Sequence, residues 1–148
     1  MVNAADLLSQ IPAGAVVTVD TAPIIYFLQD HPKFAPRFAP LFEAAERGDL
    51  HIVISAVTLV EVLTGPFQSG NEVLAGQYRE VLTRSPGWQT WPVSDEIAVS
   101  AARFRALYRL KTPDAIQVAT AVASRSHALV TSDKALAKVG NILVVGPE

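Results

Sequence analysis

The stretch Val16-Val17-Thr18-Val19-Asp20-Thr21 decides the fold, because a short β-branched run ends directly on a single acid. An uninterrupted apolar run of this length predicts a strand that is buried on both faces of a sheet. The run from Leu50 to Ile54 has the same character. A helical pattern follows each run, so the sequence predicts strands joined by helices and a mainly parallel sheet.

The rest of the chain continues this alternation. Strands are expected at Ala15–Val19, Leu50–Ile54, Ala128–Thr131 and Ile142–Val145, with an extended piece at Trp88–Val93. Helices are expected at Ala4–Ser9 after an Asn3 cap, Ile24–Leu28 after Pro23, Leu41–Arg47, from Ser55 or Ala56 to Thr64, Glu72–Leu82, Asp95–Tyr108 after a Ser94 cap, Pro113–Ser124 after a Thr112 cap, and from a Ser132-Asp133 cap to Lys138. Prolines between His31 and Pro40 predict an irregular connection, and Gly65-Pro66 predicts a helix end.

The chain of 148 residues is long enough for one domain, and a single α/β domain over residues 1–148 is expected. Its expected architecture is three-layer α/β/α with a central, mainly parallel sheet of four to five strands. Half of the residues are hydrophobic and the mean hydropathy is +0.29. A core of this size leaves part of that apolar surface uncovered, which predicts a homodimer or a protein partner.

Several classes of protein are excluded or disfavoured by what the sequence lacks. It has no cysteine, which excludes disulfides, thiolate metal sites and a cysteine nucleophile, and fits a cytoplasmic location. No run approaches the roughly 18 apolar residues of a membrane span. Met1–Pro12 has no basic residue ahead of its apolar stretch and does not resemble a signal peptide. Phosphate-binding glycine loops and the GxSxG elbow are absent.

Isolated acids are the most informative feature. Asp20, Glu61 and Asp114 are the only formally charged residues within the stretches 7–29, 50–71 and 112–124. A carboxylate in such apolar sequence costs several kcal/mol unless it is paired, hydrogen-bonded or bound to metal. Because no basic residue shares these stretches, acids that cluster in the fold would need cations. Hard oxygen ligands without cysteine or paired histidine select Mg²⁺ or Mn²⁺.

The positions of the acids support such a cluster. Asp20 and Asp133 both follow predicted strands, at the carboxyl edge of the sheet where α/β proteins bind ligands. The alternative for Asp20, Asp114 and Asp133 is an ordinary helix cap or first-turn acid. Glu61 lies inside a predicted helix, where the alternative is a partly exposed residue or a buried ion pair. Carboxylates holding Mg²⁺ or Mn²⁺ are suited to hydrolysing phosphodiesters, because the cation activates water and stabilises charge on the phosphate.

Charge distribution bears on nucleic-acid binding. The net charge of −2 and the pI near 5.9 argue weakly against it. The segment from Arg103 to Lys138 nevertheless has seven basic residues, and its only two acids are Asp114 and Asp133. Basic residues just before Asp114 are expected to steer a phosphate backbone, or simply to form a solvated helix face; they are Arg105, Arg109 and Lys111.

Four motifs in order resemble a PIN domain, particularly the VapC-type toxin ribonucleases of toxin–antitoxin modules. They are Val16-Val17-Thr18-Val19-Asp20-Thr21, Ser55-Ala56-Val57-Thr58-Leu59-Val60-Glu61-Val62, Leu110-Lys111-Thr112-Pro113-Asp114-Ala115-Ile116-Gln117-Val118-Ala119-Thr120-Ala121 and Leu129-Val130-Thr131-Ser132-Asp133-Lys134-Ala135-Leu136. The resemblance covers about residues 16–145. It implies a Rossmann-like parallel sheet and an acidic Mg²⁺ or Mn²⁺ site that cleaves RNA.

The resemblance also assigns roles to individual residues. The acidic positions of the family correspond to Asp20, Glu61, Asp114 and Asp133, as catalytic residues and metal ligands. Polar residues that support the acids correspond to Thr21, Thr131 and Ser132. Such toxins usually dimerise and are held inactive by a small antitoxin.

Two alternatives to a nuclease remain at this stage. One is a catalytically silent PIN scaffold that binds RNA or protein. The other is a phosphoacceptor signalling domain, which needs a pair of adjacent acids near the first strand, and Val19-Asp20-Thr21 lacks that pair.

Overall fold

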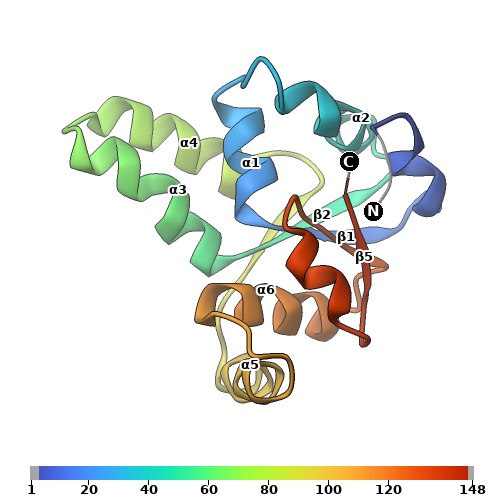
Figure 1. The fold of residues 1–148 in the computed structure, drawn as a ribbon. Helices are drawn as coiled ribbons and strands as arrows, with labels where there is room; N and C mark the ends of the chain where they lie inside the picture. Colours follow the sequence, from blue (N-terminus) through green and yellow to red (C-terminus); the bar gives the residue numbers. More distant parts are fainter. Residues whose placement is uncertain (1–3, 147–148) are drawn as a thin grey trace.

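A computed structural model of the chain describes residues 4–146 and shows a five-stranded, entirely parallel sheet (Figure 1). The strands are β1 (Val16–Val19), β2 (His51–Ser55), β3 (Trp88–Trp91), β4 (Ala128–Val130) and β5 (Leu143–Val145). Their spatial order is β3-β2-β1-β4-β5, so the strand that ends at Asp20 lies in the centre. The expected parallel sheet of four to five strands is confirmed.

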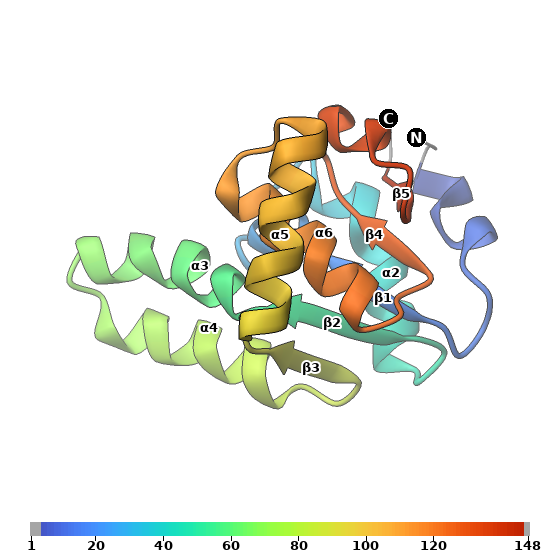
Figure 2. The same cartoon turned by 90° about the horizontal axis from the view of Figure 1, so that it is seen from below.

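Helices cover both faces of the sheet and complete the predicted three-layer α/β/α fold. They are α1 (Thr21–Leu28), α2 (Ala35–Glu46), α3 (Ala56–Gln68), α4 (Glu72–Arg84), α5 (Asp95–Tyr108) and α6 (Thr112–Ala123), with the short 3₁₀ helices η1 (Ala4–Gln10) and η2 (Lys134–Lys138). α1 and α2 lie on one face and α5 and α6 on the other, while α3 and α4 form a hairpin that extends beyond the sheet (Figures 1 and 2).

Alternate residues of the strands enter two separate cores. Val17 and Val19 of β1 pack with the α1–α2 side, whereas Leu129 of β4 packs with α5 and α6. All three side chains are fully buried. Continuous apolar strands are needed because both faces of the sheet are covered, which is the pattern that the sequence predicted. Within residues 4–146, no helix has the length and apolar character needed to cross a membrane.

The connection expected at His31–Pro40 is wrong over its second half, because α2 begins at Ala35 and contains Pro36 and Pro40. Pro36 lies in the first turn, where its missing N–H leaves no hydrogen bond unmade. Pro40 lies in the helix interior, a position that typically costs about 3 kcal/mol. Burial of Phe38, which is 1% exposed, together with Leu41 and Phe42, offsets that cost.

The helix end expected at Gly65-Pro66 is also wrong, since α3 continues to Gln68. Pro66 is buried, and its carbonyl accepts a hydrogen bond of 2.9 Å from Asn71 N at the turn into α4. The packing of the α3–α4 hairpin therefore outweighs the local breaking tendency of proline.

Smaller differences concern helix starts. α1 begins at Thr21, capped by Asp20, instead of near Pro23. Lys111, not Thr112, occupies the cap position of α6, and it makes no side-chain capping bond. The expected Ser94 and Asp133 caps are confirmed by their hydrogen bonds to Ile97 N and Ala135 N. The expected Asn3 cap lies outside the described residues.

Candidate functional site

Asp20 lies at the carboxyl end of the central strand β1 and is 8% exposed. Its backbone N–H donates to the carbonyl of Val130 at 2.9 Å, which fixes it beside the end of β4. Its Oδ1 accepts from Thr21 N at 2.8 Å and its Oδ2 accepts from Thr131 Oγ1 at 2.7 Å. Both carboxylate oxygens of Asp20 therefore accept hydrogen bonds. Asp20 caps α1, as the alternative interpretation of this residue expected, and this capping role is compatible with a role in the site.

The segment after β4 brings a second acid to the same edge. Thr131 is fully buried, and its hydroxyl, besides donating to Asp20, accepts from Asp133 N at 3.0 Å. Asp133 is exposed and its Oδ1 accepts from Ala135 N at 2.9 Å. Ser132 is exposed between them. The hydroxyl of Thr131 therefore links Asp20 to the loop that carries Asp133.

Glu61 reaches the site from α3, the helix that follows β2. Thr21 Oγ1 donates to Glu61 Oε1 at 2.8 Å. The same threonine donates its backbone N–H to Asp20, so one residue hydrogen-bonds to two of the four acids. Glu61 is exposed, whereas Thr21 is 7% exposed. The supporting position predicted for Thr21 is therefore consistent with its contacts.

Asp114 lies half-buried in the first turn of α6, and its electrostatics connect it with the other acids. Burial raises the pKa of Asp114, and the charges of Asp20 and Asp133 raise it further, while Lys111 lowers it. Burial likewise raises the pKa of Asp20, against the hydrogen bonds from Thr131 and Thr21 that lower it. The charges of Glu61 and Asp133 also raise the pKa of Asp20. Asp20 therefore lies within electrostatic range of the other three acids, and Asp114 also lies within range of Asp133.

Among residues 4–146, no basic side chain forms an ion pair with any of these four acids. Between residues 4 and 146, the ion pairs are Arg47–Asp49 and Arg84–Glu80, both on the surface and away from the four acids. An acidic cluster with hard oxygen donors and no paired cationic side chain fits Mg²⁺ or Mn²⁺ by its chemistry. As the side chains are placed, no three acids or histidines of the described part of the chain lie close enough to hold a metal ion. The metal-ligand roles therefore stay predictions.

The basic residues predicted to contact RNA have structural contacts of their own. Arg105 Nε donates to the carbonyl of Leu110 at 3.1 Å, and Arg109 ends α5 in the left-handed conformation with φ of 55°. Lys111 is exposed next to α6, and its charge acts on Asp114. The charge of Lys111 therefore reaches the acidic cluster at Asp114.

Two buried polar residues of the site were missed by the sequence-based prediction. Gln117 and Thr58 are fully buried, and Gln117 Nε2 donates to Thr58 Oγ1 at 3.0 Å. The sequence contains a signal for them. Gln117 comes three residues after Asp114 and Thr58 three residues before Glu61, a spacing that puts each on the same helix face as its acid.

Comparisons with known proteins identify the family of the chain and solved structures with a similar fold. The sequence profile described as PIN domain matches residues 17–142. A search of curated protein sequences gave no match.

Three solved structures illustrate the similarity in fold. A chain of a toxin–antitoxin complex from Klebsiella pneumoniae is 26% identical, with a TM-score of 0.68, and the match covers 89% of this chain and 98% of that one. A chain of VapBC2 from Rickettsia felis, bound to a DNA fragment from its promoter, is 16% identical with a TM-score of 0.70, covering 88% and 97%. VapC20 from Mycobacterium tuberculosis, a toxin that cleaves the sarcin–ricin loop, is 13% identical with a TM-score of 0.67, covering 88% and 99%.

Proposed function

The chain belongs to the PIN domain family, and from this premise we propose that it is a metal-dependent endoribonuclease, the toxin of a toxin–antitoxin pair. The observation that carries the proposal is the set of hydrogen bonds that gathers acids of the candidate site: Thr21 bonds to both Asp20 and Glu61, and Thr131 links Asp20 to the loop of Asp133. Asp114 lies within electrostatic range of Asp20, and none of the four acids has a basic ion-pair partner among the residues described. The similar toxin–antitoxin structures support it. The proposed catalytic unit is one domain, with its motifs in residues 16–145.

In this proposal each of the four acids has its own role in a metal site. Asp20 and Asp114 are the principal metal ligands, Glu61 completes the ligand shell or positions water, and Asp133 serves a second or weaker cation. Thr21 and Thr131 hold Asp20 in place through hydrogen bonds of 2.8 and 2.7 Å. A bound Mg²⁺ or Mn²⁺ would stabilise charge on the phosphate and make water more acidic. Lys111 is proposed to attract the RNA backbone toward Asp114.

The first test is metal removal. The purified chain, free of any partner protein, is expected to cleave RNA with Mg²⁺ or Mn²⁺ and to stop on addition of EDTA, because the acids have no cationic side chain to replace the cation. Cleavage is followed on labelled total RNA, with Mn²⁺ added back after EDTA as the control. Cleavage that persists in excess EDTA would contradict the proposal. RNA binding without cleavage under any metal condition would favour the silent scaffold.

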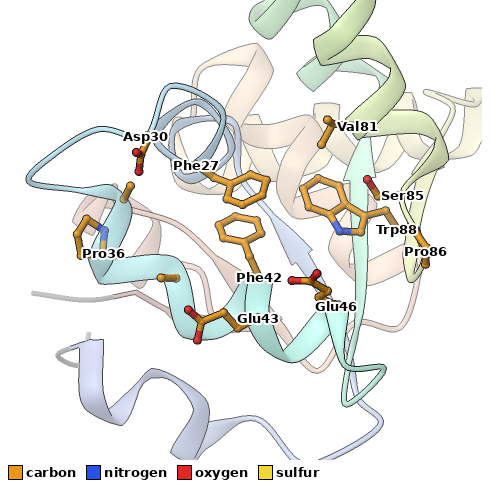
Figure 3. A pocket seen from close by; sticks show the side chains of 12 residues that line it. Phe27, Asp30, Pro36, Phe42, Glu43, Glu46, Val81, Ser85, Pro86 and Trp88 are labelled. Carbon is orange, nitrogen blue, oxygen red and sulfur yellow. The ribbon is translucent and has the colours of Figure 1, made fainter.

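The proposed protein partner has a candidate docking surface away from the acids. A groove of about 750 Å³ lies between α1, α2 and α4, and none of the four acids lines it. Its aromatic wall is formed by Phe27, Phe42 and Trp88, with 4.2 Å between the ring centroids of the two phenylalanines (Figure 3). We refer to it below as the aromatic groove.

The charges around the aromatic groove indicate the chemistry of its occupant. Asp30, Glu43 and Glu46 line it, and no lysine or arginine does. Acids beside partly exposed aromatic rings such as Phe27 favour a segment with apolar and cationic side chains, through charge complementarity and cation–π contacts. The same acids disfavour RNA. The groove is therefore proposed to hold part of the antitoxin, while the exposed Val60 and Phe67 of α3 are proposed to contribute to a homodimer or a further protein contact.

Reversing a charge at the groove provides the second test. Glu43→Lys is expected to weaken binding of a small antitoxin from the neighbouring reading frame by about tenfold at low salt, because a like charge then faces the cationic segment. RNA cleavage by the free chain should stay unchanged. Affinity is measured by calorimetry at two salt concentrations, with Glu80→Lys, an equal charge change at an exposed site on α4, as the matched control. Equal loss in both variants would remove the groove from the interface.

A further inference from the structure

Two fully buried polar side chains lie behind the acidic cluster, where apolar residues would otherwise be expected. Gln117 comes from α6 and Thr58 from α3. Gln117 Nε2 lies 3.0 Å from Thr58 Oγ1 and 3.3 Å from Thr21 Oγ1. The hydroxyls of Thr21 and Thr58 are themselves 3.1 Å apart. These contacts join α3 and α6 to Thr21, the residue that hydrogen-bonds to both Asp20 and Glu61.

The direction of each hydrogen bond in this cluster follows from the donors available. A hydroxyl has one proton, and an ionised carboxylate only accepts, so the proton of Thr21 goes to Glu61 Oε1 at 2.8 Å. Thr21 then has only lone pairs to offer its other neighbours. The proton of Thr58 must therefore point to Thr21, and both hydroxyls accept from Gln117. The donors run in one order, from Gln117 through Thr58 and Thr21 to Glu61.

The orientation of the Gln117 amide agrees with this order of donors. The opposite orientation would place Oε1 against the lone pairs of Thr21, which has already given its proton to Glu61. In the orientation observed, Gln117 Oε1 is buried and has no hydrogen-bond donor among the described residues. A buried acceptor without a donor destabilises the fold relative to an apolar side chain of similar size. Gln117 therefore lowers the stability of the fold through its unpaired Oε1, while its Nε2 donates to the hydroxyls of Thr58 and Thr21.

We propose that Gln117 and Thr58 are positioning residues for Glu61. They direct the hydroxyl proton of Thr21 onto Glu61 Oε1, and this holds the exposed Glu61 carboxylate in one orientation with its second oxygen free for a cation or water. The inference rests on the proposed function, because it assigns these two residues to the same acidic site. Residues that orient metal ligands typically change metal affinity or activity by about 10- to 100-fold when replaced.

The experiment compares two variants that break the series of donors at different points. Gln117→Met removes the amide and keeps the side-chain length, and Thr58→Val removes the hydroxyl and keeps the shape. For each, Mn²⁺ affinity is measured by electron paramagnetic resonance of the free ion, RNA cleavage as kcat and KM, and thermal unfolding in EDTA. Both variants are expected to bind Mn²⁺ and cleave about 10- to 100-fold less well. In EDTA, Gln117→Met should unfold at the wild-type temperature or above it.

Conservative and control variants separate positioning from packing. Thr58→Ser keeps the hydroxyl and is expected to restore Mn²⁺ affinity close to that of the wild-type chain. Thr120→Val removes another fully buried hydroxyl of α6, one that donates to the carbonyl of Ile116 at 2.7 Å, outside the site. It should leave Mn²⁺ affinity and cleavage unchanged. The double variant Gln117→Met/Thr58→Val should lose no more Mn²⁺ affinity and RNA cleavage than the more impaired of the two single variants, because both substitutions interrupt one series of hydrogen bonds.

Wild-type Mn²⁺ affinity in Gln117→Met, or equal losses in Thr58→Ser and Thr58→Val, would overturn the inference. If Gln117→Met fails to fold, the comparison of Thr58→Val with Thr58→Ser tests the inference instead. A wild-type chain that neither binds Mn²⁺ nor cleaves RNA would overturn the proposed function and this inference with it. An active wild-type chain with unaffected variants would overturn the positioning roles alone.

Discussion

Asp20→Asn is expected to reduce RNA cleavage on the order of 1,000-fold and, at the same time, to stabilise the metal-free protein. The loss follows because a cation that stabilises phosphate charge is worth several kcal/mol, and each 1.4 kcal/mol is about tenfold in rate. The gain follows because burial, Glu61 and Asp133 all disfavour the charge of Asp20, whose pKa is raised. Asparagine removes that charge. Its Oδ1 still caps α1 through Thr21 N, and Thr131 can accept from its amide.

Two measurements on one preparation check this expectation: cleavage with saturating Mn²⁺, and thermal unfolding in EDTA at pH 7. Asp49→Asn is the matched control, because Asp49 is an exposed aspartate in a surface ion pair with Arg47. It should change neither quantity much. Full activity in Asp20→Asn would remove its role as a ligand. A metal-free variant less stable than the wild-type chain would show that Asp20 is a structural cap.

Mn²⁺ at about 100 times its dissociation constant is expected to stabilise the folded chain by about 2.7 kcal/mol, or roughly 5–10 °C in Tm for a chain of this size. The pKa values of Asp20 and Asp114 are raised above the usual 3.8, first by burial and then by neighbouring acids. A raised pKa means that the folded state holds these protons more tightly than the unfolded state. Their contribution to stability therefore decreases as pH rises from about 4 through the raised pKa values.

The cation and the proton thus compete for the same oxygens. Without metal, the difference in the free energy of unfolding between the wild-type chain and Asp20→Asn should shrink as the pH falls, because protonation removes the buried charge of Asp20. With Mn²⁺, the stabilisation of the wild-type chain should be larger at pH 7 than at pH 5. Scanning calorimetry at both pH values, with and without Mn²⁺, measures each difference. Stabilisation by Mn²⁺ that is equal in the wild-type chain and in Asp20→Asn would place the cation elsewhere.

The parallel sheet was predictable because its signal is local. Every strand except β3, which reads Trp-Gln-Thr-Trp, is a short and mainly apolar run. Val16–Val19 and His51–Ser55 lie where the sequence puts them to within a residue or two. Helix ends were less predictable where packing opposed local preference. Pro40 and Pro66 both read as helix breakers, yet each lies within a helix whose buried residues outweigh the lost hydrogen bond.

The acids of the candidate site stand out in the sequence for a different reason. A charged residue within an apolar stretch can be recognised from the sequence alone, as with Asp20 and Glu61. Gln117 and Thr58 are uncharged, and nothing local shows that α3 and α6 bring them together over 59 residues of separation. The role of Thr131 as a bridge between Asp20 and Asp133 likewise depends on where β4 ends beside β1.

The short helix α1 has the acidic site at one end and the aromatic groove at the other. Asp20 caps its start and Phe27 lies in its last turn. Seven residues of α-helix span about 10 Å, a distance that three or four extended residues can cross. A peptide anchored in the groove would therefore need only a short tail to reach the carboxylates. Such a two-point ligand would gain strength from effective concentration, which makes this surface a starting point for compact synthetic inhibitors.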